Sequence, residues 1–185
     1  DGYTYTAGGM AAEWYDEVRT EAGAARAFRA PVVAGVAAAQ VDVLAGWGVS
    51  PLYGVADPDA ALTRLGGGLQ RIVTDADRAT VTTAARRDPA TPRFYRYASA
   101  TACAFCAMLA SRGPVYRTEA DAMRSHNYCR CFAVPVWPGE TPELPPYYAG
   151  FADDYSLAVE QAQRETGARN AKPTLSALRR IRGTR

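Results

Sequence analysis

The sequence Cys103-Ala-Phe-Cys106 is followed, after nineteen intervening residues, by His126-Asn-Tyr-Cys129-Arg-Cys131. All four cysteines of this 185-residue chain and its only histidine fall within this stretch. Thiolate and imidazole are the groups that zinc prefers, and a Cys-x-x-Cys turn directs two sulfur atoms to one point. The pattern therefore predicts one zinc site.

The predicted site has more candidate ligands than it needs, because structural zinc binds four protein groups. Cys103 and Cys106 are expected to bind. The sequence does not decide which two of His126, Cys129 and Cys131 complete the site. With four protein ligands and no open position for water, Zn²⁺ would hold the fold together rather than take part in a reaction.

Three other uses of these residues are open. A thioredoxin-like redox pair at Cys103 and Cys106 would need a βαβ context, which the flanking pattern lacks. A cysteine–histidine nucleophile pair would leave the other three cysteines unexplained. Two disulfides are the third alternative, although a chain of this length does not need them. With no second histidine and no G-x-S-x-G, no catalytic set is predicted, so we expect the protein not to be an enzyme.

The overall composition limits the possible functions. The formal net charge of +2 is too small to predict nucleic-acid binding by the chain as a whole. No apolar run is long enough to span a membrane, so we expect no membrane partner. The start of the chain has neither a signal-peptide pattern nor an initiator methionine, and we expect that residue 1 is not the start of the gene product.

Residues 1–90 are predicted to form a helical region. Apolar residues at four-residue spacing predict a helix over residues 10–22, with Met10 and Trp14 on its buried face. A second helix is predicted to begin at Pro31 and to end near Gly46.

The third predicted helix has the most regular apolar stripe of the chain, over residues 62–76. Asp57 is suited to cap its start, with Pro58 in the first turn. Gly66-Gly67-Gly68 interrupts the stripe, at a cost of roughly 1 kcal/mol per glycine relative to alanine. We therefore expect a kink or two shorter helices there.

The rest of the chain predicts an α+β fold. A strand over 93–98 with one solvent-exposed face and a second strand over 132–137 flank the metal stretch, giving a zinc-binding α+β module at 91–139. Residues 140–185 are predicted to hold a proline-rich linker, an amphipathic helix over 147–167 and an arginine-rich tail.

The C-terminal tail is basic. From Arg164 onward the chain carries seven positive side chains and one negative, Glu165. A solvated tail and a tail that contacts DNA or an acidic protein surface are both open. Contact with packaged DNA would use Arg179, Arg180, Arg182 and Arg185.

Residues Cys103–Tyr116, His126–Cys131 and Val134–Trp137 together resemble the Mu F-like minor head proteins. These are head morphogenesis proteins of tailed bacteriophages, and the resemblance is to the actinobacterial-phage type. The family pattern has a C-x-x-C turn, a downstream leucine and glycine, here Leu109 and Gly113, and a closing H-x-x-C-R-C.

Asp75, Arg78, Thr80 and Asp88 also resemble that family, so the similarity covers roughly residues 60–138. It implies a virion component inside the capsid near the portal, assembled in the host cytoplasm. Its partners would be the portal protein, the major capsid protein or both, and its role would be to assist head morphogenesis or DNA packaging and ejection. The family domain is sometimes fused to a protease or toxin, and neither is visible here.

Two alternatives remain. The chain could be a nucleic-acid-binding zinc module that stacks bases on Phe94, Tyr95 and Tyr97. It could also be a redox enzyme or a fragment of a toxin-type enzyme, in which case Cys103 would be needed for turnover.

Overall fold

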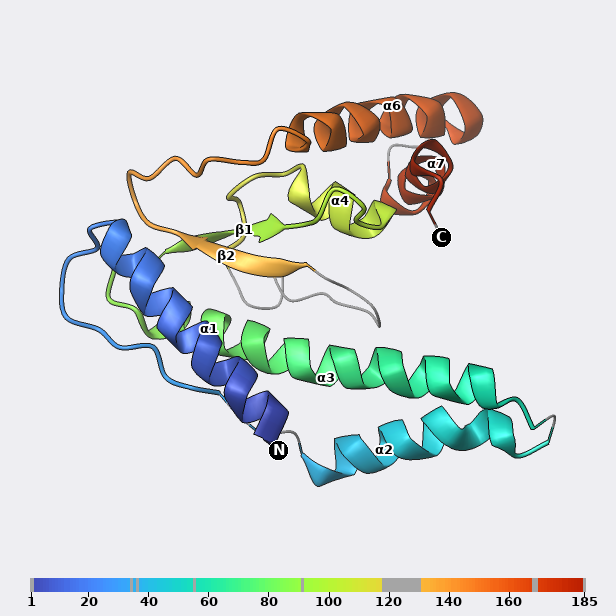
Figure 1. The fold of residues 1–185 in the computed structure, drawn as a ribbon. Helices are drawn as coiled ribbons and strands as arrows, with labels where there is room; N and C mark the ends of the chain where they lie inside the picture. The colour runs from blue at the N-terminus through green and yellow to red at the C-terminus, as the bar shows by residue number, and fades with distance from the viewer. Residues whose placement is uncertain are drawn as a thin grey trace. The chain divides into compact units, whose positions relative to one another are not determined.

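The computed structural model describes residues 2–184 except 34, 36, 55, 91, 118–130 and 168–169. These residues form several helices and a two-stranded sheet, so the predicted α+β class is confirmed (Figure 1). They divide into two compact units. The N-terminal unit consists of residues 2–92, and the C-terminal unit of residues 93–117 and 131–184.

The N-terminal unit is built on the long helix α3 (Pro58–Arg87), against which α1 (Gly2–Glu21) packs. The buried face of α1 is formed by Thr4, Gly8, Ala11, Ala12, Tyr15 and Arg19. Met10 is 67% exposed, so the predicted apolar stripe was wrong at that position. Four of these six residues are small, which allows the backbones of α1 and α3 to come close, whereas Tyr15 and Arg19 are large.

Gly8 and Gly9 provide a test of this close approach. A Cβ atom at Gly8 would lie 2.8 Å from the Val33 carbonyl oxygen, whereas one at Gly9 would have no atom within 4 Å. We expect Gly8→Ala to lower the free energy of unfolding by about 1–3 kcal/mol through overpacking. Gly9→Ala should raise it by about 0.5–1 kcal/mol, because alanine favours the helix. Urea unfolding followed by circular dichroism measures both, and equal effects would contradict the packing.

Helix α2 (Ala38–Val49) begins later than predicted, so Pro31 lies outside it. It is followed by the 3-10 helix η1 (Ser50–Leu52) and contacts α3. The prediction that Gly66–Gly68 kinks or divides the third helix was wrong, because α3 runs without interruption. A Cβ atom at Gly68 would overlap the side chain of Leu44, and one at Gly48 would overlap Leu65. These glycines let each helix receive a leucine of the other.

The start of α3 agrees with the sequence prediction. The Asp57 carboxylate accepts a hydrogen bond from the Ala60 backbone N–H at 2.9 Å, with Pro58 in the first turn. This cap satisfies one of the N–H groups that have no partner within the helix.

A buried ionic cluster joins α1 to the residue that follows α3. Arg19 donates from Nε and Nη2 to the two carboxylate oxygens of Asp88, at 2.8 and 3.2 Å. The Tyr15 hydroxyl donates to the same carboxylate at 3.0 Å, and burial raises the pKa of this phenol. Arg19 also donates to the carbonyls of Ala25 and Arg26, and so fixes the turn after α1.

The C-terminal unit contains the antiparallel strands β1 (Arg93–Tyr97) and β2 (Phe132–Val136). Both strands were predicted, but the solvent-exposed face of the first was not found. Phe94, Tyr95 and Arg96 are all buried. One reason is that the helix Ala104–Ala110 of the same unit packs on this strand.

Three helices complete the C-terminal unit: α4 (Ala104–Ala110), α6 (Tyr148–Thr166) and α7 (Ala171–Arg182). They pack on one another, and α4 also contacts β1. The helix predicted over residues 147–167 is confirmed as α6. The prediction of an arginine-rich tail needs correction, because these residues form the helix α7. This helix buries Thr174, Ala177 and Leu178. Of the helices described, none is both long enough and apolar enough to cross a membrane.

Candidate metal centre

Cys103 and Cys106 lie on the first turn of α4. Cys103 is the residue before the helix, in the N-cap position, and Cys106 is three residues further on and buried. Side chains three residues apart lie on the same side of a helical turn. The side chains of Cys103 and Cys106 therefore lie on one side of the first turn of α4.

Cys131 directly precedes β2 and is also buried. The sheet pairs Phe132 with Tyr97, the last residue of β1. Cys131 therefore lies at the end of the sheet from which the chain leaves β1 and continues into α4. The strand register thus brings a third candidate to the same end of the sheet as the Cys103–Cys106 turn.

The described residues do not complete a metal site. His126 and Cys129 lie outside them. Within the part of the chain that the structure describes, no group of three or more His, Cys, Asp or Glu side chains is arranged to hold a metal ion. Cys103, Cys106 and Cys131 are not joined to one another by a disulfide.

The loop that leads from β1 into α4 is held by side chains from the end of the chain. The Tyr148 hydroxyl accepts from the Ala98 N–H at 2.8 Å. Arg182 donates to the carbonyls of Ala100 and Ala102, at 3.1 and 3.4 Å. The Thr184 hydroxyl accepts from the N–H of Ala104, the first residue of α4, at 3.2 Å. These contacts fix the backbone that presents Cys103.

Burial raises the pKa of Tyr148, and its hydroxyl donates to the Arg96 carbonyl at 3.1 Å. Sequence reasoning missed Tyr148, Arg182 and Thr184. No local signal identifies these roles, because the backbone groups that the three side chains bind here lie at least 50 residues away in the chain.

The arginines that were predicted to contact DNA differ in their surroundings. Arg179 and Arg180 are exposed on α7, and Arg180 pairs with Glu165 at 2.7 Å. The Arg182 side chain is only 12% exposed. Its Nη1 atom lies 2.7 Å from the Asp154 carboxylate, and its guanidinium lies over the Phe151 ring. Arg182 therefore serves the fold of its own unit, and Arg185 lies outside the described residues.

Replacing Arg182 with alanine should lower the free energy of unfolding of the C-terminal unit by about 2–3 kcal/mol. The substitution removes a mostly buried ion pair and leaves two carbonyls without this donor. Arg179→Ala, on the exposed face of the same helix, should change it by less than about 0.5 kcal/mol. Chemical unfolding of both variants checks this, and similar losses would contradict the assigned role of Arg182.

The other residues of the family pattern have structural roles within their own units. Leu109 is buried, and its carbonyl accepts from the Tyr116 hydroxyl at 2.6 Å. Gly113 has a φ of 67°, a conformation that favours glycine. Arg78 pairs with Asp75 at 2.7 Å, and the Thr80 hydroxyl accepts from the Val33 N–H.

The aromatic residues of β1 offer little surface for stacking on bases. Phe94 and Tyr95 are buried, and Tyr97 stacks on Phe132 with ring centroids 5.2 Å apart. These contacts weaken the alternative of a nucleic-acid module that uses this strand.

Residues 1–158 match the model of a family described as VG15 protein. The matched range includes the whole cysteine–histidine stretch and ends within α6. Comparison with curated proteins and with solved structures found no match.

Proposed function

This chain belongs to the VG15 protein family, a viral protein family consistent with a bacteriophage origin, and we propose on this basis that it is a structural component of a phage head. The family match over residues 1–158 carries the proposal. The similarity of the cysteine–histidine stretch to Mu F-like minor head proteins supports a finer assignment. In that assignment the protein lies inside the capsid near the portal and assists head morphogenesis or DNA packaging and ejection.

The proposed role is one of assembly rather than catalysis. Its partners would be the portal protein, the major capsid protein or both, bound after synthesis in the host cytoplasm. Of the four arginines predicted to contact packaged DNA, Arg179 and Arg180 are exposed on α7. Such contacts would be sensitive to salt, because they release counterions from the phosphates.

The proposal includes a structural zinc ion bound by four of Cys103, Cys106, His126, Cys129 and Cys131. The donor set suits zinc, and two of its thiols are buried at one end of the β1–β2 sheet. When bound, the ion would supply coordinate bonds that tie the segment between α4 and β2 to the first turn of α4. That segment would then need little apolar core of its own.

Deleting the gene from the phage tests the assembly role. We expect lysates with fewer filled heads by electron microscopy, restored when the protein is supplied in trans. A deletion phage that forms filled, infectious particles in normal number would contradict the proposal. Supplying the Arg179→Ala, Arg180→Ala double variant instead would show whether these arginines matter for packaging.

The enzyme alternative makes a different prediction for Cys103. In an enzyme, Cys103→Ser would abolish turnover and leave the fold intact. For structural zinc, the same variant should lose metal and become less stable.

A further inference from the structure

The three candidate ligands that the structure describes differ in how firmly their own elements hold them. Cys106 lies within α4 and Cys131 directly precedes β2, and both are buried. Cys103 precedes α4 and is only partly buried, and its side chain does not cap the helix. A metal ligand has to be held within about 0.5 Å of its productive position. Cys103 therefore depends most on support from other elements.

The peptide groups on either side of Cys103 are both held by side chains from the end of the chain. Arg182 donates from Nη2 to the Ala102 carbonyl, which belongs to the peptide bond before Cys103, at 3.4 Å. The Thr184 hydroxyl accepts from the Ala104 N–H, which belongs to the peptide bond after it, at 3.2 Å. Because each peptide group is planar, holding both fixes the φ and ψ of Cys103, here −63° and 160°. The direction of the Cα–Cβ bond that carries the thiol is fixed with them.

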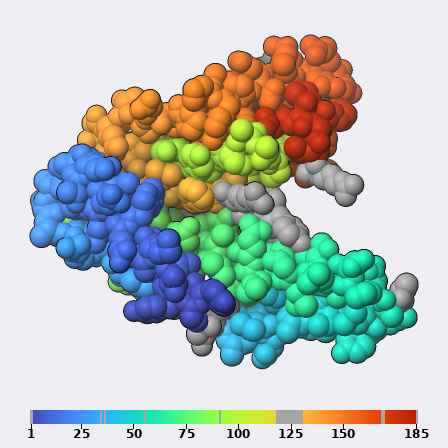
Figure 2. All heavy atoms as spheres, viewed as in Figure 1, coloured from blue at the N-terminus to red at the C-terminus, as the bar shows by residue number. Residues whose placement is uncertain are grey.

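Arg182 is itself held by α6. Its Nη1 atom lies 2.7 Å from the Asp154 carboxylate, and its guanidinium lies 4.7 Å from the centroid of the Phe151 ring. Figure 2 shows the red helix α7 packed beside the yellow-green α4 and the orange α6. The support for Cys103 is therefore part of the packed C-terminal unit.

The position of Thr184 is set by the way α7 ends. Gly183 has a φ of 60°, and its N–H donates to the Arg180 carbonyl at 3.3 Å. The Thr184 N–H donates to the Arg179 carbonyl at 3.0 Å. This pair of bonds is the Schellman motif, which fixes the backbone just after a helix. From this fixed backbone the Thr184 hydroxyl supplies an acceptor to an N–H that has no partner within α4.

We propose that Arg182 and Thr184 are positioning residues for Cys103 as a zinc ligand, so that packing of α7 and metal binding stabilise each other. The inference rests on the zinc site of the proposed function. A coupling of this kind is reciprocal, because each event changes the equilibrium of the other by the same factor. The family match ends at residue 158, so both positioning residues come from a part of the chain that the match does not cover.

The zinc affinity of the full-length chain, measured by competition with a chromophoric chelator, tests this proposal. Thr184→Val removes the acceptor and keeps the shape of the side chain, so the Kd for zinc should rise about three- to tenfold. Thr184→Ser restores the hydroxyl and should bind zinc within about twofold of the wild type. Arg182→Ala should raise the Kd at least about tenfold. If circular dichroism shows that Arg182→Ala does not fold, the two Thr184 variants carry the test.

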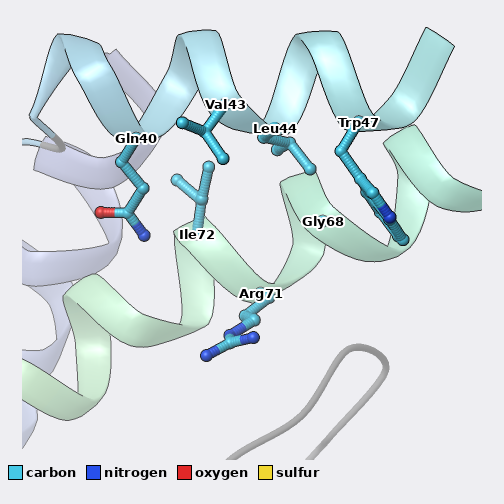
Figure 3. A pocket seen from close by; sticks show the side chains of 7 residues that line it. All are labelled: Gln40, Val43, Leu44, Trp47, Gly68, Arg71 and Ile72. Atoms are coloured by element: carbon cyan, nitrogen blue, oxygen red, sulfur yellow. The ribbon is translucent and has the colours of Figure 1, made fainter. Parts of the chain in front are cut away.

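Two control variants should bind zinc as the wild type does. Arg179→Ala changes an exposed arginine of the same helix. Gln40→Ala changes a polar side chain of the N-terminal unit, where Gln40 lines a groove of about 330 Å³ between α2 and α3 (Figure 3). A loss of affinity in these controls equal to that in Thr184→Val would overturn the proposal, because the effect would then not be specific to the residues that hold Cys103.

Hydrogen exchange tests the coupling in the opposite direction. Chelation should speed the exchange of the amides of α7, which contains no candidate ligand, at least about threefold, and should speed it less in Thr184→Val. Unchanged zinc affinity in Thr184→Val, or a loss that Thr184→Ser does not reverse, would overturn the inference while the zinc site stood. A wild-type chain that binds no zinc would overturn both.

Discussion

Replacing Asp88 with alanine is expected to lower the free energy of unfolding of the N-terminal unit by about 3–5 kcal/mol. The carboxylate is fully buried and accepts from both Arg19 and Tyr15. Its removal would leave the guanidinium buried without its counter-ion and a phenol without its acceptor. Urea unfolding followed by circular dichroism, with the fluorescence of Trp14 on α1 as a second signal, measures the loss.

Two further variants separate charge from hydrogen bonding in this cluster. Asp88→Asn keeps an acceptor for the Tyr15 hydroxyl but removes the charge, so its loss should be intermediate. Arg29→Ala removes an exposed pair with Asp16, in which the Arg29 side chain is 88% exposed, and should cost less than about 1 kcal/mol. If Asp88→Ala cost no more than Arg29→Ala, the buried cluster would not be what joins α1 to the end of α3.

Removing the proposed zinc ion is expected to have the second large effect on the stability of the chain. Structural zinc contributes about 10–16 kcal/mol of apparent binding free energy in zinc-finger peptides at pH 7. The C-terminal unit has its own apolar contacts in α6 and α7, so we expect only part of it to lose order. Trp137 is buried directly after β2, and its fluorescence should shift to longer wavelength when a chelator is added.

Metal analysis of the purified chain provides the quantitative side of this test. We expect one zinc ion per chain in the wild type and less in Cys103→Ser. Ser111→Ala, a change at the end of the same helix, should keep its zinc. Affinity should fall as the pH is lowered, because thiolate and imidazole ligands must lose their protons to bind. A stable wild-type chain that contains no metal and does not respond to chelation would exclude the zinc site.

Elements that depend on local chemistry were predictable from the sequence. The Asp57 cap, the two strands and the helix over residues 148–166 each follow from neighbouring residues in the chain. The Cys103–Cys106 turn at the start of α4 has the same local character. In each case the relevant partners lie within a few positions, so periodicity and capping rules apply.

Elements that depend on distant contacts were not predictable. Gly68 is a poor helix residue taken alone, yet it lies inside α3 because Leu44 of another helix packs on it. The strand over residues 93–98 was expected to have one solvent-exposed face, yet Phe94, Tyr95 and Arg96 are all buried, because α4 packs on this strand. Arg182 was predicted to belong to a basic tail, with contact to DNA as one alternative. In the structure it pairs with Asp154 and donates to the Ala100 carbonyl in the loop before α4.

Quantitative mass spectrometry of purified virions tests the central claim most directly. Intact particles would be treated with an external protease before analysis, so that only enclosed proteins are protected. The proposed function predicts peptides of this chain in every preparation, in few copies relative to the major capsid protein, and unaffected by the protease. Their absence from purified, infectious virions would contradict a role as a component of the phage head.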